Sequence, residues 1–370
     1  MKNGLAKPAI LRISSALTQV LPQFNENAFI DNCLDNIESL ELKERVNHLI
    51  VVLHQHLPQD FSLTAQALAN IVPIWDFGDP DDALRSFAAW PLIDYIAEHG
   101  IECPEIALPL MKTLTALFSA EFAIRPFILK YPELCHQYLT QWCQDDDHHV
   151  RRLVSEGTRP RLPWGIQLKP FVKDPTPTKI YLDTLKDDTS LYVRRSVANH
   201  LNDIAKDHPD VVINMCQHWL SQCDNKPTDE LQWLIKHATR TLVKKGMPEV
   251  FPLLGYTNKP KIKVEMLRCD AKITLGDALS FTLEIKSTAA KKQRFVIDYA
   301  IHFVKANGAT SAKVFKLKNV ELAAKQTLVI EKSHPIKPIS TRKYYPGKHV
   351  LEILVNGECK ASQSFVLHLD

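Results

Sequence analysis

The sequence lacks long hydrophobic runs, paired cysteine motifs and an N-terminal signal. No apolar run reaches the roughly 18 residues that a membrane-spanning helix requires, which excludes such a helix. The N-terminus MKNGLAKPAILRISSAL has no long apolar core and no small-residue cleavage site, so we expect no secretory signal. None of the eight cysteines forms a CxxC pair, and Cys216 and Cys223 have no second ligand cluster. We therefore expect free thiols in a reducing cytoplasm, and no metal or cofactor.

The charges are unevenly distributed along the 370 residues, although the net charge is only +3. Residues 259–370 contain 20 basic and 10 acidic side chains, so this segment carries about +10 and the rest about −7. A basic module joined to an acidic body suggests a polyanionic partner for the module. The alternative is that lysines on strand edges only prevent aggregation.

Two kinds of periodicity divide the chain near residue 260. Residues 1–255 show apolar side chains at three- and four-residue spacing, as in LKERVNHLIVVLHQHL, EIALPLMKTLTALFSAEFAIRPFIL and DELQWLIKHATRTLVKKG, which predicts helices. Residues 259–370 contain at least six short alternating runs, which predicts an immunoglobulin-like β-sandwich. The fold class is therefore an all-α repeat followed by an all-β domain, joined by GYTNKPKIK.

The helical part contains an internal repeat. An acidic turn followed by Val-Arg-Arg occurs at Val150 and again at Val193, 43 residues later. This period agrees with the roughly 40–47 residues of HEAT-type helical repeats, in which equivalent helices line one surface. Residues in phase would form a basic stripe that can follow a phosphate backbone. The stripe consists of Arg151, Arg152, Arg194, Arg195, Lys236, Arg240, Lys244 and Lys245.

A structural interpretation of Val-Arg-Arg stays open beside this one. One arginine of each pair can instead bond the acidic turn before it, at residues 145–147 or 187–188. Arg159 and Arg161 lie on the adjoining loop and are not explained by that role. We therefore count them among the predicted DNA contacts.

The segment VRRLVSEGTRPRLPW, residues 150–164, resembles the central signature of the AlkC-type DNA alkylation repair glycosylases. These are HEAT-like repeat proteins in a superfamily that also includes AlkD. The segments FAAWPLIDYIAEHG, SAEFAIRPFILKYPE and VRRSVANHLNDIAKDHP are similar to the same family. Some members carry an immunoglobulin-like C-terminal domain.

The resemblance implies a monofunctional glycosylase that removes 3-methyladenine and 3-methylcytosine from double-stranded DNA without flipping the base into a deep pocket. Methylation places a positive charge on the base and weakens its bond to the sugar. A carboxylate near the sugar would stabilise the developing cation and orient water, and an aromatic face favours a cationic base. We expect the protein to act as a monomer, in the bacterial cytoplasm, associated with the nucleoid.

The resemblance also implies site residues. Glu156 is the first candidate for the catalytic carboxylate, and its alternative is a helix pair with Arg152. Glu121 is the candidate for a second active-site carboxylate, and its alternative is a helix-capping or solvated glutamate. Asp203 falls in the helix of the next repeat and is a candidate for a third carboxylate. Trp164 follows two prolines that stiffen its loop, and it is the candidate aromatic wall.

Two residues beside Glu121 complete the predicted site. Phe122 is a candidate wedge between base steps, although a place in the core is equally consistent with the sequence. Arg125 is a candidate phosphate contact. The competing hypothesis for the whole protein is a non-enzymatic HEAT-like scaffold that binds DNA or protein through the same surface.

Overall fold

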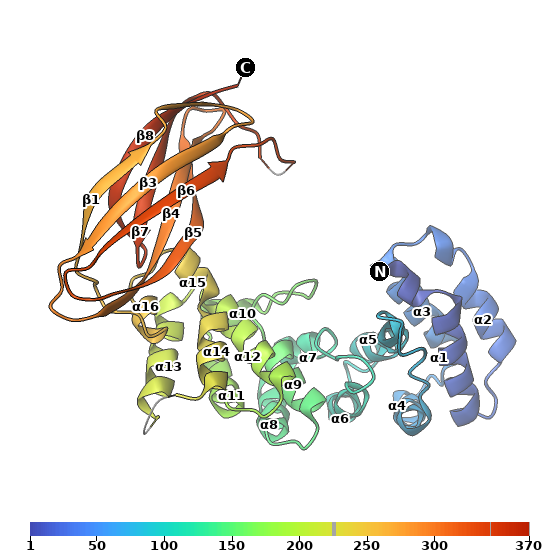
Figure 1. Ribbon diagram of the computed structural model, residues 1–370. Coiled ribbons are helices and arrows are strands. Elements are labelled where there is room, and N and C mark those ends of the chain that lie inside the picture. Colours follow the sequence, from blue (N-terminus) through green and yellow to red (C-terminus); the bar gives the residue numbers. More distant parts are fainter. Residues whose placement is uncertain (224–226, 341, 370) are drawn as a thin grey trace. The chain divides into compact units, whose positions relative to one another are not determined.

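The structure is a computed structural model that describes residues 1–223, 227–340 and 342–369. The chain divides into two compact units, residues 1–207 and 208–370. In Figure 1 the helices run from blue to yellow along the sequence, and the strands that follow them are orange to red. Secondary structure changes from helix to strand between Leu253 and Ile262, which confirms the predicted fold class. The two compact units meet at residue 207. The predicted boundary between the helical and the immunoglobulin-like domain, at residues 255–259, stays a prediction.

Unit 1 is built from helices α1–α12 and short 3-10 turns. The α-helices are α1 (Lys7–Val20), α2 (Glu26–Leu34), α3 (Leu42–His56), α4 (Phe61–Ile71), α5 (Trp90–His99), α6 (Pro104–Leu114), α7 (Ile124–Lys130), α8 (Pro132–Trp142), α9 (His148–Gly157), α10 (Lys169–Lys173), α11 (Lys179–Leu185) and α12 (Leu191–Ile204). The 3-10 turns span Lys2–Leu5, Ile37–Ser39, Val72–Ile74, Arg85–Ala89 and Thr176–Thr178.

Prolines begin helices in this chain more often than they interrupt them. Pro91, Pro104 and Pro132 lie in the first turns of α5, α6 and α8. Proline is tolerated at these positions because the first turn has no intrahelical acceptor for its missing N–H. A sequence with 23 prolines can therefore remain helical.

The predicted repeat is visible in helices α9 and α12, which pack against each other. Val150 and Val193 are both buried at the same position of their helices. Each helix begins directly after an acidic turn, and the Asp147 side chain accepts from the His149 N–H to cap α9. The two valines therefore occupy equivalent positions in successive repeats.

The segment predicted as one helix from residue 105 to 129 is broken. Helix α6 ends at Leu114 and α7 begins at Ile124, and the Ala120 N–H donates to Thr115 Oγ1 in the connection at 3.2 Å. A side-chain acceptor that competes with the helix ladder favours such a break. The break places Glu121 in a turn, where it is not constrained to one face of a continuous helix.

Unit 2 begins with helices α13 (Pro209–Ser221), α14 (Asp229–Ala238), α15 (Arg240–Lys244) and α16 (Val250–Leu253). The sequence predicted one helix from 229 to 246, but Thr239 separates α14 from α15. The Thr239 hydroxyl donates to the Ile235 carbonyl at 2.8 Å, a contact that commonly bends a helix.

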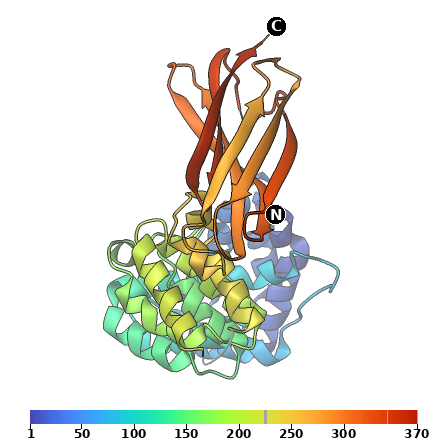
Figure 2. The ribbon, with the colours of Figure 1, turned by 60° about the vertical axis from the view of Figure 1, so that its left-hand side comes forward.

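The rest of unit 2 is a sandwich of two sheets (Figure 2). One sheet has the order β1-β3-β6 and the other has the order β2-β8-β7-β4-β5. Alternate side chains of both sheets, among them Phe281, Tyr299 and Phe365, form one apolar core. The strands are β1 (Ile262–Cys269), β2 (Lys272–Thr274), β3 (Ala278–Ser287), β4 (Gln293–Val304), β5 (Thr310–Leu322), β6 (Thr327–Pro335), β7 (Gly347–Val355) and β8 (Glu358–His368).

Candidate active site

Glu121 and Glu156, which are far apart in the sequence, meet at the guanidinium of Arg152 in unit 1. Arg152 donates through Nη1 to Glu121 Oε2 and, at 2.5 Å, to Ser119 Oγ. Its Nη2 lies 3.6 Å from Glu156 Oε1. The turn before α7 and the last turn of α9 are therefore joined by one cation. The i,i+4 pair that was the alternative explanation for Glu156 is present, but it is one part of a larger cluster.

Asp203 belongs to the same cluster through a second arginine. Arg159 donates from Nη1 to Glu156 Oε1 at 2.6 Å and from Nε to Asp203 Oδ2 at 2.8 Å. Lys206 Nζ donates to the other oxygen of Asp203 at 2.8 Å. Negative and positive groups thus alternate in the order Glu121, Arg152, Glu156, Arg159, Asp203, Lys206, and we call this set the charge ladder.

The two glutamates of the ladder differ in their electrostatic environment. Burial raises the pKa of Glu121 and the Glu156 charge adds to this, while Arg152 opposes it. Burial also acts against the charged form of Glu156, but Arg152 and Arg159 outweigh it and lower the pKa of that carboxyl. Ser196 Oγ donates to Glu156 Oε2 at 2.5 Å and stabilises the same anion. Glu156 is therefore a fixed carboxylate, whereas Glu121 takes up a proton more easily.

Trp164 lies on the loop of residues 158–168, which we call the Trp164 loop. Its side chain is 60% exposed and its backbone is left-handed, with φ of 65°. The Leu168 N–H donates to the Pro160 carbonyl at 3.2 Å and closes the loop. A methyl group at Gly165 would lie 3.3 Å from Phe122 Cδ1, so the loop packs against the residue that follows Glu121.

Phe122 is half-buried and belongs to an aromatic group under this loop. Its ring stacks on Trp90, with the centroids 5.6 Å apart. The ammonium of Lys43 lies 5.2 Å from the Phe122 ring centroid and donates to the Trp164 carbonyl at 3.3 Å. Both the core and the wedge interpretations of Phe122 are consistent with a half-buried ring.

The first arginine of each Val-Arg-Arg pair serves the repeat itself. Arg151 Nη1 donates to the Asp145 and Asp146 carbonyls, and the same guanidinium pairs with Asp188. Arg194 Nη1 donates to the carbonyls of Asp188 and Thr189. These contacts give Arg151 and Arg194 a structural role, and DNA contact by either residue stays a prediction.

Arg125, a predicted phosphate contact, lies inside unit 1. Its side chain is fully buried, and it donates to the Gly157 carbonyl at 2.8 Å and to the Ile166 carbonyl at 2.7 Å. A guanidinium with no exposed surface cannot contact a phosphate without rearrangement of the loop above it. Arg159 is likewise buried and pairs with Glu156 and Asp203, and its contact with DNA stays a prediction.

The remaining predicted DNA contacts are accessible to different degrees. Arg195 is exposed on α12, and Arg161 is half-buried in an ion pair with Asp207. Lys236 and Arg240 lie in unit 2 and line a groove of about 540 Å³ between α14–α16 and strands β4 and β5. The groove also contains three other lysines, and its floor is apolar. Those lysines are Lys244, Lys313 and Lys316.

Several residues that the sequence did not single out belong to the charge ladder or contact it. Lys206 is its last member, Ser119 and Ser196 hydrogen-bond to Arg152 and Glu156, and Tyr192 places its ring 4.9 Å from the Arg152 guanidinium carbon. Ser196 follows Val193 by three residues, so helical periodicity places it on the face toward α9. That spacing is the one signal in the sequence that could have identified it.

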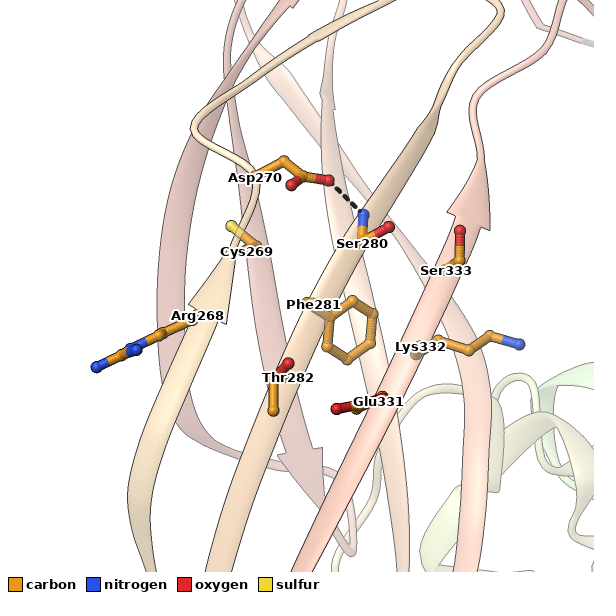
Figure 3. A pocket seen from close by; sticks show the side chains of 9 residues that line it. All are labelled: Arg268, Cys269, Asp270, Ser280, Phe281, Thr282, Glu331, Lys332 and Ser333. Atoms are coloured by element: carbon orange, nitrogen blue, oxygen red, sulfur yellow. Dashed lines mark hydrogen bonds between the residues drawn. The ribbon is translucent and has the colours of Figure 1, made fainter.

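A second hollow of about 530 Å³ lies on the sheet β1-β3-β6 (Figure 3). Arg268 and Lys332 line it together with Asp270 and Glu331, and Asp270 Oδ2 accepts the Ser280 N–H at 2.7 Å. Two cations and two carboxylates balance one another, so this hollow has no excess charge that would attract a polyanion.

The groups that the site offers are carboxylates, cations and an exposed indole. Within the described ranges, no group of three or more His, Cys, Asp or Glu side chains could hold a metal ion. None of the helices in the part of the chain that the structure describes is long and apolar enough to cross a membrane.

Repeated helix pairs with a carboxylate cluster, followed by a β-sandwich, define a HEAT-like repeat protein with an immunoglobulin-like domain. Residues 263–369 match the family model described as the C-terminal Ig-like domain of the uncharacterised protein YhaZ. The chain is 37% identical over 346 residues to YhaZ of Bacillus subtilis strain 168, and this match covers 93% of the chain and 92% of YhaZ.

A solved structure is similar over almost the whole chain. It is the alkylpurine DNA glycosylase AlkC of Pseudomonas fluorescens, bound to DNA containing an abasic site analog. It has 36% sequence identity to this chain and a TM-score of 0.81, and the alignment covers 99% of both chains. The chain therefore belongs to the AlkC-like family, as the resemblance of residues 150–164 predicted.

Proposed function

We propose that this protein is a DNA glycosylase that excises alkylated bases. The observation that carries the proposal is the meeting of Glu121 and Glu156 at Arg152, beside a loop that exposes Trp164. Membership in the AlkC-like family supports it, since the related Pseudomonas fluorescens protein is an alkylpurine DNA glycosylase bound to DNA. We further propose that the enzyme acts as a monofunctional hydrolase, without a covalent lysine intermediate.

The two glutamates are suited to different steps of base excision. As the bond between base and sugar breaks, positive charge moves to the deoxyribose, and a fixed carboxylate stabilises it. Glu156 fits this role because two arginines and Ser196 keep it ionised. The attacking water must lose a proton, and a carboxylate with a raised pKa is the stronger base. Glu121 fits that second role.

The proposed substrates are 3-methyladenine and 3-methylcytosine. Both bases are cationic, so their bond to the sugar is already weakened, and the exposed face of Trp164 would favour them over neutral bases. We propose that the base is not flipped into a deep pocket and that the carboxylates act on the sugar. Uracil, which is neutral, should consequently not be excised.

The proposed DNA contacts lie in both units. Arg195 and Arg161 are accessible in unit 1. In unit 2, the groove lined by Lys236 and Arg240 contains five cations and one carboxylate, Asp298. Such a groove attracts a phosphate backbone without reading base sequence. We therefore propose that unit 2 adds to DNA affinity.

An assay of base release distinguishes the proposed enzyme from a non-enzymatic scaffold. Purified protein is incubated with methylated double-stranded DNA, and released bases are quantified for wild type and Glu156→Gln. We expect release of both methylated bases by wild type, and a decrease of about 100-fold or more for the variant. DNA binding should be preserved, since glutamine retains the size of the side chain. Binding without release by wild type would favour the scaffold.

A further inference from the structure

Arg125 connects the two segments that carry the proposed catalytic groups. Its Nη1 donates to the carbonyl of Gly157, the last residue of α9 and the neighbour of Glu156. Its Nε donates to the carbonyl of Ile166, two residues beyond Trp164. One rigid guanidinium thus holds the end of α9 and the far side of the Trp164 loop at the same time.

The Trp164 loop needs such a constraint. A tryptophan in the left-handed region is strained, and strained backbone persists only where the surroundings determine it. The indole is 60% exposed, so its direction depends mainly on its backbone. An added methyl group at Gly165 would lie 3.4 Å from Arg125 Nε, which shows how closely the loop approaches this side chain.

Stability alone does not explain a buried arginine here. Burial lowers the pKa of Arg125 to about 10, and the charge of Arg159 acts in the same direction. Arg125 Nη2 is buried and has no hydrogen-bond partner among the described residues. A buried cation with an unused donor is costly, and an apolar side chain of similar size is often as stabilising. The two backbone contacts, in contrast, specify one loop geometry.

We propose that Arg125 is a positioning residue that holds the Trp164 loop against the end of α9 and so sets where the indole stands relative to Glu156. This inference rests on the proposed glycosylase function for its effect on rate. The link between Arg125 and the loop geometry can be tested without any excision. Lysine keeps the charge, but its donors all lie on one nitrogen and cannot reproduce the separate Nε and Nη1 positions from which Arg125 reaches the two carbonyls.

The test uses Arg125→Lys, Trp164→Ala and the double variant in the full-length protein. For Arg125→Lys we expect a single-turnover excision rate about 10- to 100-fold lower than that of wild type. Misplacement of a reacting group by about 1 Å lowers a rate by up to about 100-fold. The DNA concentration for half-maximal rate should change by less than about 3-fold. In the Trp164→Ala background, Arg125→Lys should have little further effect, because the two changes remove the same interaction.

The control is Arg45→Lys, which removes a guanidinium that is equally buried. Arg45 lies on α3, is 1% exposed and donates to the carbonyls of Leu40, Lys2 and Leu5. We expect it to lower thermal stability while the excision rate per folded molecule stays close to wild type. A rate loss in Arg45→Lys as large as that in Arg125→Lys would reduce Arg125 to a general stability effect and overturn the proposal.

Hydrogen exchange of the unliganded protein provides the second measurement. Amides of residues 158–168 should exchange faster in Arg125→Lys than in wild type or Arg45→Lys. Unchanged exchange in this loop, or rate effects of Arg125→Lys and Trp164→Ala that multiply, would overturn the proposal. If wild type excises no methylated base, the proposed function fails, and the exchange result alone still decides the role of Arg125.

Discussion

Arg152 donates to the carboxylate of Glu121, 31 residues away in the chain, and its other terminal nitrogen lies 3.6 Å from Glu156. The Arg152 side chain is 14% exposed, and its guanidinium carbon lies 4.9 Å from the centroid of the Tyr192 ring. Its neighbour Arg151 is bound to the backbone of the turn before α9. Two adjacent arginines of one motif therefore have different roles: Arg151 holds the turn before α9, and Arg152 joins the two glutamates.

Arg151→Ala and Arg152→Ala should separate folding from catalysis. Loss of Arg151 leaves the Asp188 carboxylate and two carbonyls without their donor, so unfolding should require about 1–3 kcal/mol less free energy. The excision rate of Arg151→Ala per folded molecule should remain within a few-fold of wild type. Arg152→Ala should reduce the rate by at least about 100-fold, because Glu121 and Glu156 lose their common partner. Chemical denaturation and single-turnover kinetics measure the two effects, and the reverse pattern would contradict these assignments.

The pH dependence of excision should report the protonation of Glu121. Burial raises the pKa of this carboxyl, so it takes up a proton before Glu156 does as the pH falls. The single-turnover rate should therefore decrease on acidification with a midpoint above the ordinary glutamate value of about 4.3. Spontaneous base loss is measured at each pH without enzyme and subtracted. A rate that stays constant down to about pH 4.5 would argue against Glu121 as the base.

The groove in unit 2 should contribute to the salt dependence of DNA binding. Lys236→Ala combined with Arg240→Ala should weaken binding to all DNA sequences alike. The slope of log K against log salt should become smaller by about 0.9 for each phosphate that these two side chains neutralise in the wild-type complex. Lys272→Ala, an exposed lysine on β2 outside this groove, is the matched control. Equal slopes for the double variant and wild type would show that the groove does not bind the backbone.

Asp94 should make the protein less stable above about pH 6. Burial raises the pKa of Asp94 to about 6, although the Trp90 indole donates to it at 2.7 Å. The folded state then holds a proton that the unfolded chain releases near pH 4, so this stabilisation is complete below about pH 4 and lost as the pH rises through about 6. Asp94→Asn keeps an acceptor for Trp90 and removes the charge.

The comparison of wild type with Asp94→Asn between about pH 4 and pH 8 isolates this effect. At about pH 7.5 the variant should be more stable by about 3 kcal/mol, since burial raises the pKa of Asp94 by roughly two units and each pKa unit corresponds to about 1.4 kcal/mol. The difference should disappear near pH 4. Denaturation curves at each pH measure it, and a difference that does not vary with pH would exclude Asp94 as its cause.

Sequence periodicity was sufficient to predict the architecture of this protein, a helical repeat followed by a β-sandwich. The 43-residue recurrence of Val-Arg-Arg predicted equivalent helices, and α9 and α12 have this relationship. Alternation after residue 260 predicted the sandwich. Both signals are local or strictly periodic, and each follows from burying one face of a helix or strand. The helix breaks at residues 115–123 and at Thr239 were missed, because threonine side-chain contacts with the backbone do not alter the apolar pattern.

The sequence by itself determined which residue types are present, including the candidate carboxylates at 121, 156 and 203, and which arginines recur in the same phase of the repeat. Only the tertiary structure decided which arginines are accessible. Arg125 and Arg159 are as basic as Arg195 in the sequence, yet the first two are buried between backbone carbonyls and carboxylates while Arg195 is exposed. The physical reason is that a guanidinium binds whichever acceptors packing brings within about 3 Å, and those acceptors come from distant segments.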